Sequence, residues 1–163
     1  MTSFDVIQHL TKINDFILQQ LKDELMQQGH RDTGRLINSL QYQLIQESNA
    51  VVALFTYLQY GQYVNDGVPA SKVKYPIRVL IDWARRKGFT DPRSAAFAIR
   101  AKHKKEGIPT RGSFRFSRNG RRTQWRDHVL SNIRGDLDAI IDTELIDPLR
   151  IFFFTMLKEN QVI

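Results

Sequence analysis

Hydrophobic positions at the start of the chain recur every three or four residues and predict one long amphipathic helix from about Ser3 to Gln28. Such spacing places side chains on a single helix face. The predicted N-cap is Ser3 and the predicted C-cap is Gly29. The apolar positions of this face are Phe4, Ile7, Leu10, Ile13, Ile17, Leu21 and Leu25.

The pattern then changes to one typical of a short helix followed by a β-hairpin. The stretch "DTGRLINSLQ" begins with residues that cap helices, and it predicts a short helical turn. The next runs, "LQYQLIQES" and "AVVALFTY", alternate or are β-branched and apolar, and they predict two strands joined by the polar "ESNA". A further helical segment, "LQYGQYVNDG", is predicted to end at its Asn-Asp-Gly breaker.

The sequence next predicts two helices, each with a proline at its start. Pro76 suits the first position of a helix that runs to Lys87, with Gly88 as the stop. The segment "TDPRSAAFAIRAKHKKEG" repeats this arrangement, with Asp91 as the cap and Gly107 at the end. Both segments therefore predict helices with defined ends.

The last part of the chain predicts long helices. From Trp125 the apolar positions again follow helical spacing, until Asp147-Pro148 is expected to interrupt or kink the helix, because proline has no N–H and clashes with the preceding turn. A final helix, "PLRIFFFTMLKEN", is expected to close the chain.

Together these segments predict an α+β protein. A small antiparallel sheet is flanked by helices, with a long N-terminal helix, a basic hairpin arm and C-terminal helices. A chain of 163 residues fits one domain. Within that domain we expect a helix-sheet-helix core over 1–107, a basic arm or hairpin over 108–124, and C-terminal helices over 125–163.

Positive charge is concentrated in one stretch of this sequence. The whole chain carries a net charge of +7, whereas Arg100 to Arg126 alone holds ten basic residues and one acid, Glu106, a balance of +9. The remaining 14 basic and 16 acidic residues nearly cancel, at −2. The body is thus close to neutral, and the basicity is local.

Six arginines of this stretch are the candidate contact residues, and three interpretations of them stay open. They are a solvated loop, a surface that pairs with acidic groups on a neighbouring protein, or a contact with DNA phosphates. "RNGR" is a hairpin signal, so residues 112–124 are predicted to form a two-stranded ribbon with Asn119-Gly120 at its tip. Strand alternation would then place Arg115 opposite the rings of Phe114 and Phe116. The six residues are Arg111, Arg115, Arg118, Arg121, Arg122 and Arg126.

Composition narrows the class of protein further. A hydrophobic content of 42% with ten phenylalanines suits a globular core, and the lack of cysteine excludes disulfides and thiolate chemistry. No apolar leader begins the chain, and the longest apolar run, Ile151 to Phe154, is too short to span a bilayer. We therefore expect a soluble protein that is made in the cytoplasm and has no membrane partner.

Catalytic patterns are not evident in the sequence. It contains no Walker A, GxGxxG or HExxH motif, and its four histidines occur singly, outside metal-ligand spacing. Asp138 and Asp142 share a helix face, but acids on a polar helix face are usually solvated. Ser131 and His128 lie three residues apart without a nucleophile elbow around them. We predict a protein that is not an enzyme and needs no cofactor or metal.

Aromatic residues allow two interpretations. Trp83 and Trp125 could stack on nucleic-acid bases, but each lies in a periodic helix where packing is favoured. Phe152, Phe153 and Phe154 cannot all face one side of a helix that turns 100° per residue. They are either buried on several sides within the monomer or part of an exposed apolar patch. We favour the patch, which makes them candidates for a subunit interface.

Three segments in order resemble a known family. "TGRLINS" matches Thr-Gly-x-Leu-x-x-Ser, "YGQYVNDG" matches Tyr-x-x-x-Val-(acidic or Asn)-x-Gly, and "AFAIRAKHKKEGIPTRGSF" matches a later Gly-Ile-Pro segment. Together they resemble phage tail-completion proteins, also called head–tail joining or neck proteins, over about Asp32 to Phe116. The matching positions are Thr33, Gly34, Leu36, Ser39, Tyr60, Val64, Gly67, Gly107, Ile108 and Pro109.

The resemblance implies a function as well as a fold. Such proteins are α+β subunits of a ring, commonly of six copies, in the virion neck between a portal-side adaptor or connector and the tail tube or tail proteins. They have no catalytic residues. Because a ring built for DNA transit should not bind DNA tightly, we favour contact of the basic arm with a neighbouring protein and only transient contact with genomic DNA. The chain departs from the family pattern at Asn65, where many members carry Glu, and in its extra helices. The alternative function is that of a small basic protein that binds nucleic acid without sequence specificity.

Physical chemistry gives the motif residues local roles. Thr33 or Asp32 is expected to cap the N–H groups of the short helix. Gly67 suits a positive φ after the "VND" turn. Tyr60 and Tyr63 share one helix face, which suits packing under the sheet or binding, and we favour packing. Gly107-Ile108-Pro109 should stop a helix and force an extended exit, because the residue before proline is pushed out of the α region.

Overall fold

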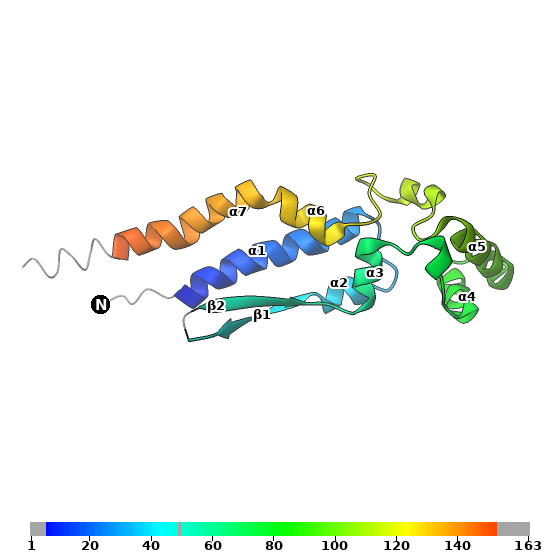
Figure 1. Cartoon of the computed structure of the whole chain (residues 1–163), viewed down its shortest axis with the longest axis horizontal. Coiled ribbons are helices and arrows are strands. Elements are labelled where there is room, and N and C mark those ends of the chain that lie inside the picture. The colour runs from blue at the N-terminus through cyan, green and yellow to red at the C-terminus, as the bar shows by residue number, and fades with distance from the viewer. Residues whose placement is uncertain (1–5, 49, 153–163) are drawn as a thin grey trace, which may run out of the picture.

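The computed structural model describes residues 6–48 and 50–152, and it is an elongated molecule arranged around one long helix (Figure 1). That helix, α1 (Val6–Gln27), lies between the β-hairpin on one side and the C-terminal helices on the other. The pair α4 and α5 forms one end of the molecule. Helices with a two-stranded antiparallel sheet confirm the predicted α+β class.

The end of α1 is fixed by a glycine, as the sequence predicts. Gly29 has φ 73° and donates its N–H to Met26 O at 3.0 Å, while His30 N–H donates to Leu25 O at 2.9 Å. This pair of hydrogen bonds is a Schellman motif, which satisfies carbonyls that have no partner inside the helix. The predicted N-cap, Ser3, lies outside the described residues.

A short helix and a hairpin follow. Helix α2 (Arg35–Ser39) precedes β1 (Gln41–Gln46) and β2 (Val51–Thr56), which pair antiparallel with Tyr42 opposite Phe55. The face of the hairpin that carries Tyr42 and Phe55 turns toward α1, because the Tyr42 hydroxyl donates to Asp15 Oδ1 at 2.8 Å. The other face exposes three apolar side chains, Ile45, Val52 and Leu54.

The predicted cap of α2 is wrong. Gly34, in the left-handed region at φ 75°, takes the N-cap position, and no side chain caps the helix. Thr33 is exposed, and the Asp32 carboxylate instead pairs with the guanidinium of Arg86 on α4 and lies 3.6 Å from Lys87 Nζ. Asp32 therefore joins the α4–α5 end to the rest of the molecule.

The hydrophobic core surrounds Trp125, whose side chain is fully buried. Its indole N–H donates to Gly61 O at 3.2 Å, and the ring meets Tyr57 edge-on, with centroids 5.3 Å apart. A Cβ on Gly61 would come within 2.7 Å of the Tyr57 ring, so only glycine lets this helix approach so closely. Packing of Trp125 is thus confirmed. The core also contains Leu21, Leu25, Leu36, Leu40, Val129 and Ile133.

Three helices carry the chain to the far end and back. They are α3 (Tyr60–Asp66), α4 (Ile77–Arg86) and α5 (Pro92–Glu106), with a 3₁₀ turn, η1 (Ala70–Lys72), before α4. Asp91 caps α5 as predicted, since its Oδ1 accepts from the N–H groups of Arg93 and Ser94. Pro76 is the N-cap of α4 rather than its first helical residue.

The predicted two-stranded basic ribbon is wrong. The chain after α5 forms a 3₁₀ helix, η2 (Arg111–Phe116), and residues 117–124 follow without strands. Arg118 N–H donates to Gln27 O at 2.7 Å, and Gln124 N–H donates to Asn65 O at 2.6 Å. The loop folds back because a carbonyl at the end of α1 and a carbonyl of α3 accept its N–H groups.

The C-terminal helices break earlier than predicted. α6 (Trp125–Asn132) ends at Ile133, α7 (Arg134–Ile141) follows, and a π-helical turn, η3 (Asp142–Ile146), leads into helical residues 147–152. In the π turn, Asp147 N–H bonds to Asp142 O. A proline ring clashes with the carbonyl four residues back in an α-helix, so the wider turn lets the helix pass Pro148. Of the predicted interface residues, Phe152 is half-buried, and Phe153 and Phe154 lie outside the described residues.

Candidate functional site

The motif segments around Gly67 and Gly107 meet in space. Val68 N–H donates to Ile108 O at 2.6 Å, and Ile108 N–H donates to Val68 O at 2.8 Å, which makes an isolated antiparallel bridge. A Cβ on Gly67 would lie 2.8 Å from Ile108 O, and one on Gly107 would lie 2.6 Å from Val68 O. Both glycines also have positive φ, at 73° and 87°. The bridge therefore requires glycine at both positions.

Most other motif positions hold α2 and α3 in place. Leu36 is buried in the core at 3% exposure, and Val64 packs against it in part. The Ser39 hydroxyl donates to Leu36 O at 2.8 Å and accepts from Leu58 N–H at 3.1 Å. Packing of Tyr60 and Tyr63 under the sheet is wrong, because these side chains are 43% and 60% exposed.

Asn65, the position that departs from the resembled pattern, is a buried hydrogen-bond hub. Its side-chain amide donates to Asp66 Oδ1 at 3.0 Å and to Asp127 Oδ2 at 2.9 Å, and its Oδ1 accepts from Arg126 N–H at 3.1 Å. These amide hydrogen bonds lower the pKa of both Asp66 and Asp127. A carboxylate at position 65 could not donate to these two acids.

The loop that follows η2 is tied to the last turn of α1 by two side-chain amides, those of Gln28 and Asn119. Gln28 is fully buried, and its Nε2 donates to Glu24 Oε1 at 2.8 Å and to Thr123 O at 3.0 Å. Asn119 Nδ2 donates to the same Glu24 oxygen at 2.9 Å. Asn119, the expected tip of a free hairpin, is therefore an anchor.

Arg122 and His30 complete this attachment. Arg122 Nη1 donates to Gln28 O at 2.7 Å, which places a cation at the negative end of the α1 dipole. His30 Nε2 lies 3.2 Å from both Arg122 O and Gln28 Oε1. Burial, and then the charge of Arg122, lowers the pKa of His30 to about 4. His30 is therefore neutral near pH 7.

The six candidate arginines fall into two groups. Arg122 and Arg126 serve the fold: Arg126 Nε pairs with Asp127 Oδ1 at 3.0 Å, and its Nη1 donates to Tyr57 and Gln62. The remaining four are exposed and form no ion pair within residues 6–48 and 50–152. We call them the exposed arginines: Arg111, Arg115, Arg118 and Arg121.

The expected placement of Arg115 opposite two rings is wrong. Its guanidinium carbon lies 4.8 Å from the centroid of the Phe116 ring, a cation–π contact, because η2 is helical rather than extended. Phe114 and Phe116 are 40% and 63% exposed.

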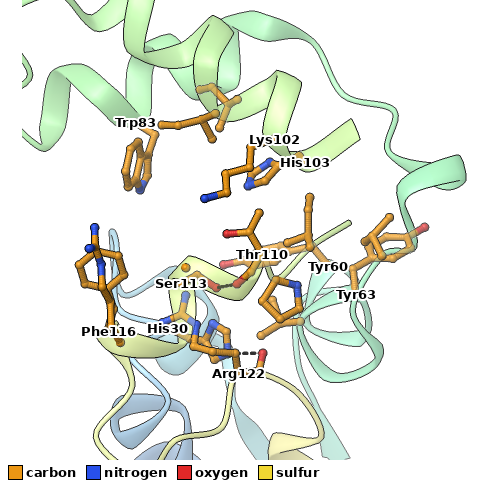
Figure 2. Close-up of a pocket in the computed structure, with 18 of the residues that line it drawn as sticks. His30, Tyr60, Tyr63, Trp83, Lys102, His103, Thr110, Ser113, Phe116 and Arg122 are labelled. Carbon is orange, nitrogen blue, oxygen red and sulfur yellow. Dashed lines mark hydrogen bonds between the residues drawn. The ribbon is translucent and has the colours of Figure 1, made fainter. Parts of the chain in front are cut away.

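A groove of 660 Å³ lies beside the exposed arginines, between α4–α5 on one side and α3 and η2 on the other (Figure 2). Figure 2 shows Trp83 and Phe116 on facing walls and Lys102 above His30 and Arg122. Tyr60 and Tyr63, which the sequence suggested for packing or binding, line it as well. We call this hollow the aromatic groove. Helical spacing marked Trp83 as a packing residue, whereas it forms a groove wall.

The residues named above as catalytic candidates do not form a catalytic arrangement in the described part of the chain. The Ser131 hydroxyl donates to the backbone oxygen of His128 at 2.9 Å, not to its ring. Asp138 and Asp142 are exposed on and after α7. No three histidine, cysteine or acidic side chains gather as metal ligands among the residues the structure describes. Within the same residues, no helix is long and apolar enough to cross a membrane.

Comparison with known proteins gives no match: no family model, curated protein or solved structure is similar to this chain at a significant level.

Protonation of His30 should make stability depend on pH. Because the folded state holds the pKa near 4, against 6.5 for an ordinary histidine, the unfolded chain binds the proton first as pH falls. The free energy of unfolding should therefore decrease by about 3 kcal/mol between pH 6.5 and 4. Urea unfolding over this pH range should show a clearly smaller decrease for His30→Gln than for wild type. Equal decreases would contradict the assignment.

Asn65→Asp should destabilise the protein by about 2–4 kcal/mol at pH 7, because it buries a carboxylate against Asp66 and Asp127. The folded pKa of the new acid would be raised, so the loss should shrink as pH falls toward about 4. Urea unfolding at pH 5 and pH 7 measures both effects. The exposed change Asn38→Asp is the matched control, and equal losses in the two variants would refute the hub.

Proposed function

We propose that this chain is a structural subunit of a phage neck, a tail-completion or head–tail connector protein that joins the portal-side connector to the tail. The main support is the bridge between Val68 and Ile108. The resemblance rests on segments far apart in the sequence, and two of them form one structural joint with glycines required on both sides. Residues that match a motif and share one joint support a common fold rather than chance matches.

The roles of the motif residues fit a structural protein. Leu36, Ser39 and Val64 hold helices together, and Gly67 and Gly107 make the bridge. Function would then depend on surfaces presented to other proteins, as expected for a virion component. The exposed arginines provide such a surface, because a guanidinium makes bidentate hydrogen bonds to carboxylates.

Charge is distributed along the molecule in a way that suits a ring. The exposed arginines lie toward the α4–α5 end, whereas the acidic residues Asp136, Asp138 and Asp142 are exposed on and after α7, at the other end (Figure 1). Opposite charges at opposite ends favour head-to-tail contact between copies. Such contacts close into a ring when the rotation between neighbours permits it. The resemblance suggests six copies, in the virion neck.

A nonsense codon at Gln19 in the phage genome that encodes the chain tests this proposal. We expect electron micrographs of the lysate to show DNA-filled heads and separate tails, because the subunit that joins them is missing. A suppressor host that inserts glutamine is the control and should restore joined particles. Joined, infectious particles without suppression would rule the proposal out.

A second candidate function, binding of nucleic acid without sequence specificity, is favoured by the same exposed arginines. Four guanidinium groups on η2 and the loop after it, without an ion pair among the residues the structure describes, could contact phosphates, which carry no sequence information. A ring through which a genome passes, however, should not hold DNA tightly. We therefore expect protein contact to be the main role, with DNA contact transient.

A DNA-binding titration over a salt series separates the two functions. The test variant changes the four exposed arginines to Gln, and the control variant makes the same charge change at Arg78, Arg93, Arg134 and Arg150. We expect weak binding that differs by less than about threefold between the variants. Tight binding whose salt slope decreases by about 3–4 in the test variant alone would make nucleic-acid binding the function.

A further inference from the structure

We infer that the aromatic groove is a docking site for a peptide segment of a partner protein, one that places a bulky apolar side chain next to a carboxylate. Its walls, its charges and the neighbouring surface each support this occupant. The inference does not depend on a role in a phage neck, because it follows from the chemistry of the groove alone.

The walls of the groove are aromatic and open to solvent. Trp83 and Phe89 lie with ring centroids 5.8 Å apart, and Phe89 is 45% exposed. Phe116 and Tyr63 are 63% and 60% exposed. Clustered exposed aromatic rings are uncommon on a monomer and mark sites where apolar groups bind. A volume of 660 Å³ accommodates a few side chains rather than a whole helix.

The charged groups in the groove are basic. Lys102, Arg115 and Arg122 line it, and no aspartate or glutamate of the described residues does. Lys102 Nζ lies 4.0 Å from Glu106 Oε1, which is a long ion pair, and Arg115 forms no ion pair with the described residues. Arg122 uses only Nη1 in its hydrogen bonds to Gln28 and Gly29, and its Nε has no acceptor among the described residues. The groove therefore complements an anionic group beside an apolar one.

A peptide fits these observations better than nucleic acid. A nucleic-acid strand needs a row of cations that follows its phosphates. Of the four exposed arginines only Arg115 lines the groove; the other three lie outside it. A concave apolar hollow with few cations instead resembles sites that take an anchoring side chain of a peptide.

The two tryptophans of the chain provide a direct readout. Trp83 lines the groove and Trp125 is fully buried in the core, so 5-fluorotryptophan labelling of the full chain gives one ¹⁹F resonance for each site. Trp83→Phe assigns the two resonances. The probes are acetyl-Asp-Leu-Phe-Asp-amide, its Asn and Lys counterparts, and an eight-residue oligothymidylate.

The acidic peptide should shift the Trp83 resonance with saturation near or below about 1 mM, and leave that of Trp125 unchanged. The Asn peptide should bind about fivefold more weakly, and the Lys peptide more weakly still, because they lose the charge contacts. No shift, equal binding of the acidic and Lys peptides, or a Trp83 shift with oligothymidylate alone would overturn the inference.

Matched variants locate the contact. The double change Lys102→Gln and Arg115→Gln should weaken binding of the acidic peptide about fivefold or more, since both cations line the groove. The control double change Arg118→Gln and Arg121→Gln alters charge equally outside the groove and should have no effect. Phe116→Ala should weaken all three peptides. An equal effect of the two double changes would show a general charge effect and overturn the inference.

Discussion

The carbonyl groups at the C-terminal end of α1 control how the rest of the chain is arranged. A helix end leaves several carbonyls without partners, and burying them unsatisfied is costly. Here the partners come from far along the sequence: Arg118 N–H reaches Gln27 O, and Arg122 reaches Gln28 O. Once that loop is fixed, Trp125 follows directly into the core against α2 and α3. The basic stretch therefore attaches the later part of the chain to the end of α1, in addition to presenting a charged surface.

Local patterns allowed much of the fold to be predicted, and long-range hydrogen bonds explain where they failed. Helix α1, the hairpin, the Asp91 cap and the glycine at the end of α1 depend on neighbours in sequence, and all are confirmed. The ribbon at "RNGR" is wrong because Arg118 N–H donates to Gln27 O and Asn119 Nδ2 donates to Glu24 Oε1, so the loop is attached to α1 instead of pairing with itself as two strands. No feature of the local sequence indicates that binding to α1 would replace strand pairing within the loop.

The candidate site likewise combines features that the local sequence predicts with features that only long-range contacts create. Glycine at 67 was predicted to supply a positive φ, and it does, but its closeness to Ile108 O depends on a segment about 40 residues away. The separation of Arg122 and Arg126 from the exposed arginines could not be read from spacing, since all six look alike in sequence. The half-buried His30 and the amide of Asn65 likewise gain their roles from Arg122 and Asp127, which only the fold brings near.

The bridge between Val68 and Ile108 has a mechanical consequence. The chain enters and leaves the α4–α5 pair at this one place, and Asp32 provides a second attachment through Arg86 and Lys87. The pair is therefore attached to the rest of the chain at two points. Because the aromatic groove lies between this pair and α3 and η2, a small change in the angle at these attachments would open or narrow it. A bulky side chain held in that groove would fix the angle between the α4–α5 pair and the rest of the chain.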